Sequence, residues 1–134
     1  MNEKTNQKGL LLSLAWMTSN NHYSLKAAKK EKGNESALLL ALFDLLEVLS
    51  KTPWEDLTKL TKYDTDKGGF EELPVQAMKL GILDEMPSDI AKQVESVLVF
   101  RFNKGQDRLI AYKMDNTLYL LGFDLHFKLY DHGN

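Results

Sequence analysis

Apolar residues recur at helical spacing between Glu35 and Lys51, and this is the strongest secondary-structure signal in the chain. The recurring positions share one side of a helix: Leu38, Leu39, Leu42, Leu45, Leu46 and Leu49. Three more apolar residues widen that side: Leu40, Phe43 and Val48. Only Asp44, Glu47 and Lys51 form a polar stripe. The pattern therefore predicts a helix that is buried on most sides, with Asn34 as its N-cap.

A second helix is predicted to begin almost immediately, in "TPWEDLTKL". Thr52 is a good capping residue, Pro53 suits the first helical position because it needs no donor, and Glu55 completes a capping box. So short a connection favours two adjacent, antiparallel helices.

Short apolar runs predict strands towards both ends of the chain. The run "LLLSLAWM", residues 10–17, is predicted to be a buried first strand. The last third contains "VLVFRF", "RLIAYKM" and "TLYLLGFDL", separated by the turn "NKGQD" and by Asp115-Asn116, which predicts a three-stranded antiparallel meander. The first of these strands places two sets of residues on opposite faces: Leu98, Phe100 and Phe102, and Val97, Val99 and Arg101. Since both faces carry apolar groups, we expect helices on one face and partial cover on the other.

The remaining segments are less regular. "HYSLKAAKKEKGN" is compatible with a strand or a short basic helix, and residues 61–96 are predicted to be an irregular acidic insert containing short helices. The element order is then β-α-α-insert-β-β-β. It predicts an α+β fold with a helical hairpin on a small antiparallel sheet. We expect a single domain over residues 1–134, with residues 1–9 as a flexible tail.

Composition removes several classes of function. The chain has 134 residues and no cysteine, which excludes disulfides, thiolate metal sites and a cysteine nucleophile. Its early apolar run is too short to cross a membrane, and no cleavage pattern follows it, so we expect a cytoplasmic protein. The net charge is −2, but residues 34–96 hold six lysines against thirteen acidic residues, whereas residues 1–33 hold six lysines against two glutamates.

The stretch "FDLHFKLYDHGN" concentrates side chains that can do chemistry. In an extended conformation, four of them share one face: His126, Lys128, Tyr130 and His132. This arrangement is typical of a site on a rigid strand, and equally of a solvated strand face. A metal site from Asp124, His126 and His132 requires the tail to turn back on itself, so no metal is expected.

The segment from Val99 to Gly133, "VFRFNKGQDRLIAYKMDNTLYLLGFDLHFKLYDHG", resembles the C-terminal half of RelE/ParE-type toxins of bacterial toxin–antitoxin systems. It is also similar to uncharacterised bacterial and phage proteins with the same kind of ending. The resemblance implies a β-α-α-β-β-β core and an endoribonuclease that cleaves mRNA, on the ribosome or in a ribosome-like way. It implies no cofactor or metal, because the RNA 2′-hydroxyl is the nucleophile, and it implies a small antitoxin protein as partner.

The resemblance also implies roles for individual residues. The catalytic positions are Arg101, Arg108, His126 and Tyr130, and Lys128 is placed to neutralise phosphate. Apart from these matched positions, Lys113, Lys29 and Lys30 are further candidate nucleic-acid-binding residues. Histidine suits acid–base work because its pKa lies near neutrality, and the arginine fork holds two phosphate oxygens. The basic cluster of residues 26–32 is an alternative contact for an acidic antitoxin tail.

Two features depart from that family. Its members are usually strongly basic, whereas this chain offers few phosphate contacts, and the acidic insert has no counterpart. A second hypothesis is therefore a non-catalytic module, from a phage or mobile element, that binds a protein through its acidic middle region. A third is a metal-dependent hydrolase.

Overall fold

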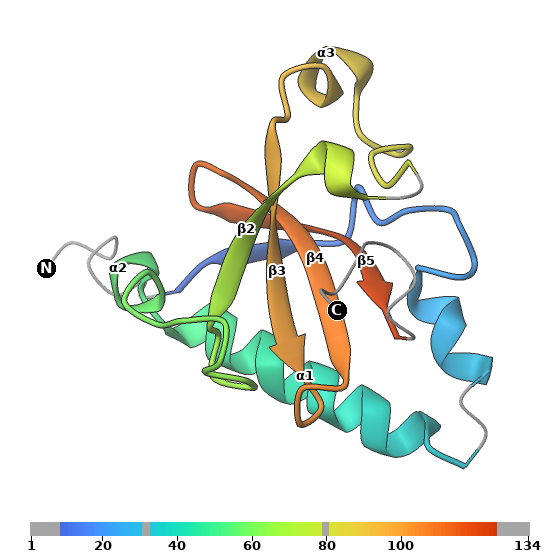
Figure 1. Cartoon of the computed structure of the whole chain (residues 1–134), viewed down its shortest axis with the longest axis vertical. Helices are drawn as coiled ribbons and strands as arrows, with labels where there is room; N and C mark the ends of the chain where they lie inside the picture. The colour runs from blue at the N-terminus through green and yellow to red at the C-terminus, as the bar shows by residue number, and fades with distance from the viewer. Residues whose placement is uncertain (1–8, 31–32, 79–80, 126–134) are drawn as a thin grey trace, which may run out of the picture.

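A five-stranded mixed sheet and one long helix form the framework of the protein (Figure 1). The computed structural model describes residues 9–30, 33–78 and 81–125. The strands are β1 (Leu11–Ser13), β2 (Phe70–Pro74), β3 (Ser96–Phe102), β4 (Asp107–Met114) and β5 (Thr117–Asp124). Their order across the sheet is β1-β5-β4-β3-β2, with β1 parallel to β5 and the other pairs antiparallel. The predicted α+β class is confirmed.

The long helix α1 (Glu35–Lys51) has the predicted bounds and crosses one face of the sheet (Figure 1). Its buried positions are Leu38, Leu42, Leu45 and Leu49. Leu40 and Phe43 are each 65% exposed, so the helix is buried along one stripe and not on most of its sides. The expectation of extensive burial was wrong because no second long helix in the described ranges packs against the outer side of α1. Asn34 occupies the N-cap position but makes no side-chain capping bond.

The predicted helical hairpin is reduced to α1 followed by a single turn, α2 (Trp54–Leu57). Thr52 does not cap α2, because its hydroxyl donates to the Val48 carbonyl, at 2.6 Å, and closes α1 instead. Pro53 takes the N-cap position of α2. The capping box is therefore absent, and the sheet face is covered mainly by α1.

The first strand is shorter and more exposed than predicted. β1 covers only three residues at one edge of the sheet, and Leu11 is 57% exposed. Leu10, just before it, is the buried residue, and its N–H bonds to the carbonyl of Leu49 in α1. An edge strand has a neighbour on one side only, which explains why its apolar residues are not enclosed.

The middle of the chain is more ordered than an irregular insert. It supplies the opposite edge strand, β2, which the sequence pattern did not predict, followed by η3 (Val75–Ala77) and α3 (Ser88–Ala91). The two short helices agree with the short helices expected there. The earlier basic segment forms a 3₁₀ helix, η2 (Leu25–Lys30), rather than a strand.

Apolar side chains fill both faces of the sheet, as predicted. Leu98, Phe100 and Phe102 pack in the cluster that includes the buried stripe of α1, while Val97 and Val99 lie in a second cluster. The second cluster is closed by side chains of the middle segment, Met78, Ile82, Met86 and Val94. Of the helices in the described ranges, none combines the length and apolar character needed to cross a bilayer.

Candidate functional site

Arg101 on β3 and Arg108 on β4 are direct partners in the strand register, and Arg108 is in turn opposite Asp124 on β5. Residues opposite each other in antiparallel strands project to the same side of the sheet. These three side chains therefore form a row across the face that is turned away from α1. The sequence predicted that the side chains of Arg101 and Arg108 would lie on the same face of the sheet, and this strand register agrees with that prediction.

The two arginines have different surroundings. Arg108 is only 6% exposed, and its Nη1 donates to the carbonyls of Gly105, at 2.7 Å, and Asp107, at 3.2 Å. It thus ties down the turn between β3 and β4. A buried guanidinium committed to backbone carbonyls is better placed to position this turn than to grip a phosphate from solvent.

Arg101 faces a more open environment. Its guanidinium carbon lies 5.2 Å from the ring centroid of Tyr63, which is 73% exposed, and its Nη2 lies 4.0 Å from a carboxylate oxygen of Glu71. Lys62 completes the group, with its ammonium 5.4 Å from the same ring and 3.3 Å from Glu71. We call Lys62, Tyr63, Glu71 and Arg101 the Tyr63 patch.

The Tyr63 patch combines an exposed aromatic ring with two cations and one carboxylate. Glu71 pairs with both cations, so the group keeps an excess of positive charge. The Nε of Arg101 is buried and has no hydrogen-bond partner within the described part of the chain. Aromatic rings beside cations suit single-stranded nucleic acids, because the ring stacks on a base while the cations meet the phosphates.

Two acidic residues near the Tyr63 patch, Asp64 and Asp66, are hydrogen-bonded to the backbone. Asp64 accepts the N–H of Thr61, at 2.9 Å, and Asp66 accepts the N–H groups of Asn103 and Lys104. These bonds shape the turns around the Tyr63 patch. Within the described ranges, no three His, Asp or Glu side chains are grouped closely enough to hold a metal ion.

Several predicted site residues are not brought to this face. Lys113 sits on the α1 side of the sheet, where its ammonium lies 4.8 Å from the ring centroid of Trp54. Lys29 is exposed on η2, and Lys30 ends η2 but its side chain is outside the described part of the structure. Four further predicted residues are also outside the described part of the structure: His126, Lys128, Tyr130 and His132. Their roles stay predictions.

Tyr63 and Lys62 were missed by sequence reasoning because they fall in the segment read as an acidic insert, and Glu71 was considered only as part of an acidic protein-binding surface. The available signal was weak: a lysine next to a tyrosine in "TKYD". Their importance depends on β2 pairing with β3, which places Glu71 opposite Val99 and within reach of Arg101.

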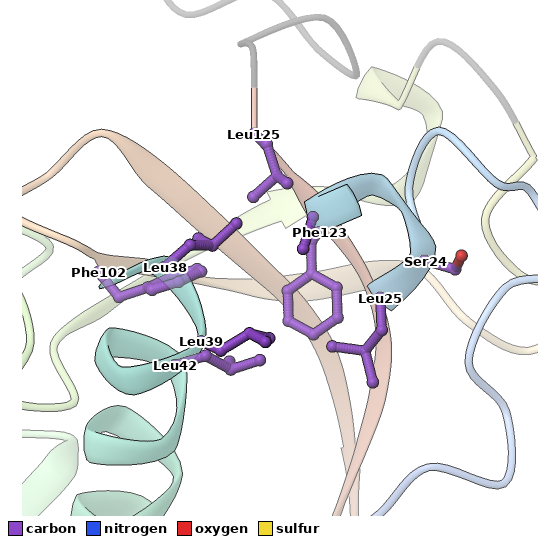
Figure 2. A pocket seen from close by; sticks show the side chains of 9 residues that line it. Ser24, Leu25, Leu38, Leu39, Leu42, Phe102, Phe123 and Leu125 are labelled. Carbon is purple, nitrogen blue, oxygen red and sulfur yellow. The ribbon is translucent and has the colours of Figure 1, made fainter. Parts of the chain in front are cut away.

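A second surface feature is an exposed apolar strip on α1. Leu39, Leu40 and Phe43 are exposed there, and Leu25 of η2 is exposed beside them. Figure 2 shows Leu25 and Leu39 at a small pocket whose other walls include Leu42, Phe102 and Phe123. We call Leu25, Leu39, Leu40 and Phe43 the apolar strip. Contiguous exposed apolar groups of this kind often mark interaction surfaces.

Comparison with known proteins does not place this chain in a family. No family model, curated protein or solved structure matches it. What the chain does must therefore be inferred from the Tyr63 patch, the arginine row and the apolar strip.

Proposed function

We propose that the protein is a RelE/ParE-like toxin that binds and cleaves mRNA, with the Tyr63 patch as its RNA contact. The observation that carries the proposal is the Arg101 guanidinium beside the exposed ring of Tyr63, with Lys62 on the same ring. Its expected location is the cytoplasm, where mRNA and ribosomes are found.

The Tyr63 patch can hold one nucleotide step. The Tyr63 ring stacks on a base, an interaction that contributes about 1–3 kcal/mol per base in single-stranded complexes. The fork of Arg101 binds two oxygens of the adjoining phosphate, and Lys62 adds a second positive charge. Glu71 orients both cations before RNA arrives.

The chemistry follows from the resemblance. A general base removes the proton of the RNA 2′-hydroxyl, the 2′-oxygen bonds to phosphorus, and the bond from phosphorus to the 5′-oxygen breaks. A general acid protonates the leaving 5′-oxygen, so the products are a 2′,3′-cyclic phosphate and a 5′-hydroxyl. His126 and Tyr130 are the proposed acid–base pair, and Arg108 is a positioning residue for the β3–β4 turn.

The test is induction of the chain in a bacterial host. We expect the wild type to stop growth and to produce mRNA fragments ending in 2′,3′-cyclic phosphates. Purified protein should cleave mRNA in the presence of ribosomes, in a ribosome buffer that contains no metal chelator. This cleavage should not depend on added transition metals. If the wild type leaves growth and mRNA intact, the proposal fails.

Variants separate binding from folding. Arg101→Gln and Tyr63→Ala should lower RNA affinity and cleavage together, Arg101→Lys should retain part of both, and His126→Ala should lose cleavage with RNA binding retained. Lys92→Gln is the matched control, because Lys92 is exposed at the end of α3, away from the Tyr63 patch. Equal activity for Arg101→Gln and the control would exclude the Tyr63 patch as the contact.

The apolar strip favours a second candidate, a protein-binding module. Lys26 and Lys29 are exposed on η2 beside the apolar strip, so the complementary partner is a small antitoxin-like protein with apolar side chains flanked by acidic ones. This moves the expected interface from the acidic middle region to α1. The test is co-expression with the product of the neighbouring reading frame: Phe43→Asp should abolish the complex, whereas charge reversal at Glu85 should not.

A further inference from the structure

A groove opens on the α1 side of the sheet, between α2 and strands β2, β3 and β4. Its volume is about 350 Å³, and no residue of α1 lines it. The side chains that define it are Trp54, Phe70, Glu72, Ser96, Leu98 and Lys113. Small organic ligands occupy pockets from about 300 Å³ upward. The groove is thus large enough for a ligand of this class.

One side of the groove is aromatic and apolar. Trp54 and Phe70 are stacked, with ring centroids 5.2 Å apart and an angle of 17° between the rings, and buried Leu98 lies on the strand beside them. Both rings are only half-buried. A surface of this kind favours a ligand with a planar ring.

The polar groups lie at separate places around this apolar surface. The ammonium of Lys113 contacts the Trp54 ring and has no carboxylate within ion-pair distance in the described ranges. Glu72 is exposed and lines the groove, and its Oε2 accepts a hydrogen bond from the Ser96 hydroxyl at 2.5 Å. The groove thus offers one cation and one carboxylate that do not neutralise each other directly.

The strand register sets the spacing of these two charges. Glu72 is on β2 and Lys113 is on β4, with β3 between them and an offset of two residues along β4, so their backbones are about 12 Å apart. Leu98 is opposite both Glu72 and Ala111, which puts Glu72, Leu98 and Lys113 on one face. A ligand that reaches both groups needs an anion at one end and a hydrogen-bond donor at the other, joined by a flat body.

We propose that this groove binds a nucleotide whose base carries an amino group. The phosphate would meet Lys113, the base would lie along the aromatic side, and the amino group would donate to Glu72. A carboxylate accepts but cannot donate, so it favours the amino groups of cytosine, adenine or guanine over the O4 acceptor of uracil. The site is on the opposite face from the Tyr63 patch and does not require it.

The test is titration of the full chain with CMP, UMP and cytidine, followed by calorimetry or by NMR shifts of the groove residues. We expect CMP to bind at least about tenfold more tightly than UMP, the ratio that one specific base contact can supply. CMP should also bind more tightly than cytidine, which lacks the phosphate. Equal affinity for CMP and UMP would overturn the base assignment and with it the proposal.

Variants assign the two ends of the ligand. Lys113→Met should reduce CMP affinity to that of cytidine, and Glu72→Gln should remove the preference for CMP over UMP. Lys92→Met and Glu85→Gln are the matched controls on exposed side chains outside the groove, and circular dichroism checks that each variant is folded. CMP binding that neither groove variant alters would place the ligand elsewhere and overturn the proposal.

Two sources can supply the nucleotide, and one comparison distinguishes them. A short RNA ending in cytidine 3′-phosphate that binds at least tenfold more tightly than CMP would identify an RNA end as the ligand, whereas equal or weaker binding would identify a free nucleotide. Arg101→Gln should leave the CMP-induced NMR shifts of the groove residues unchanged, because Arg101 does not line the groove, so failure of the proposed toxin function and failure of this site give different results.

Discussion

The carboxylate of Asp66 accepts the backbone N–H groups of Asn103 and Lys104, at 2.8 and 3.2 Å, and so ties the middle of the chain to the turn between β3 and β4. That turn is unusual, since Asn103, Lys104 and Gly105 all have left-handed φ values of 55°, 61° and 86°. Such a backbone is unfavourable for residues other than glycine unless neighbouring groups hold it. Asp66 supplies that restraint just before the strand that carries Arg108.

Removal of the Asp66 carboxylate should therefore destabilise the fold. We expect Asp66→Ala to lower the free energy of unfolding by about 1–3 kcal/mol, because two backbone donors lose their acceptor. Asp66→Asn should lower the free energy of unfolding by less than Asp66→Ala does, since its amide oxygen can still accept one hydrogen bond. Urea unfolding measures the change, with exposed Glu85→Ala as the control. A loss no larger for Asp66→Ala than for the control would contradict this account.

The stability of the protein should depend on acid pH through Asp84. Burial, the largest single influence, raises the pKa of this carboxyl, but hydrogen bonds from the Ser19 and Thr18 side chains and from backbone N–H groups outweigh it, so the pKa is lowered from 3.8. The Ser19 hydroxyl and N–H donate to Oδ2 at 2.7 and 3.0 Å.

A lowered folded-state pKa means that the ionised carboxylate stabilises the fold above its unfolded-state pKa, and that this contribution is lost as the pH falls through the folded-state value. Wild type should therefore be more stable than Asp84→Asn at neutral pH, and the difference should shrink below pH 3.8. Urea unfolding across a pH series measures it. A difference that stays constant down to the most acid pH would show that Asp84 acts through shape and not through charge. The side chain is mostly exposed, so we expect a modest effect.

Two glycines should respond in opposite ways to alanine. A Cβ at Gly69 would lie 2.0 Å from the Thr61 carbonyl oxygen and 2.8 Å from the Asp64 Cβ, whereas a Cβ at Gly81 would meet nothing within 4 Å. Gly69→Ala should cost at least about 1–3 kcal/mol of unfolding free energy, since backbone must shift. Gly81→Ala should be neutral or stabilise by about 0.4–1 kcal/mol, because it restricts the unfolded chain. Thermal unfolding of both variants measures the two effects. Equal effects on stability would contradict the prediction and would show that the backbone at Gly69 is free to move.

Helix α1 should show a strong contrast between its two sides. Leu45 is fully buried and Phe43 is 65% exposed. Leu45→Ala should cost about 2–5 kcal/mol through lost burial and the cavity it leaves. Phe43→Ala, on the apolar strip, should change stability by less than about 0.5 kcal/mol. Chemical denaturation of the isolated chain measures the unfolding free energy of both variants. A large loss of stability for Phe43→Ala would mean that Phe43 is covered in solution.

The elements that the sequence predicted well are those specified by local pattern. The leucine spacing defines α1, and the turn at Asp115-Asn116 together with the alternation of "VLVFRF" defines the meander, because neighbouring residues alone determine these structures. β2 was missed because "FEELP" carries two glutamates and a proline, and becomes a strand only by pairing with β3. α2 lacks the predicted Thr52 cap because the Thr52 hydroxyl bonds back to the Val48 carbonyl of α1.

The same distinction applies to the candidate site. The pairing of Arg101 with Arg108 follows from the hairpin turn, so it could be anticipated from the sequence. The burial of Arg108 could not, since it depends on the carbonyls of Gly105 and Asp107 turning inward. Tyr63 reaches Arg101 only because distant segments fold together, which no local pattern reveals.

The parallel pairing of β1 with β5 has a consequence for how the protein is made. Leu11 lies opposite Thr117, so a strand near the start of the chain must wait for one of the last strands to be translated. Until then the nascent chain exposes Leu10 and the inner side of α1, and long-range pairing of this kind closes slowly. Folding is thus expected to finish only after residue 124 has emerged, and a chaperone that shields α1 meanwhile would raise the yield.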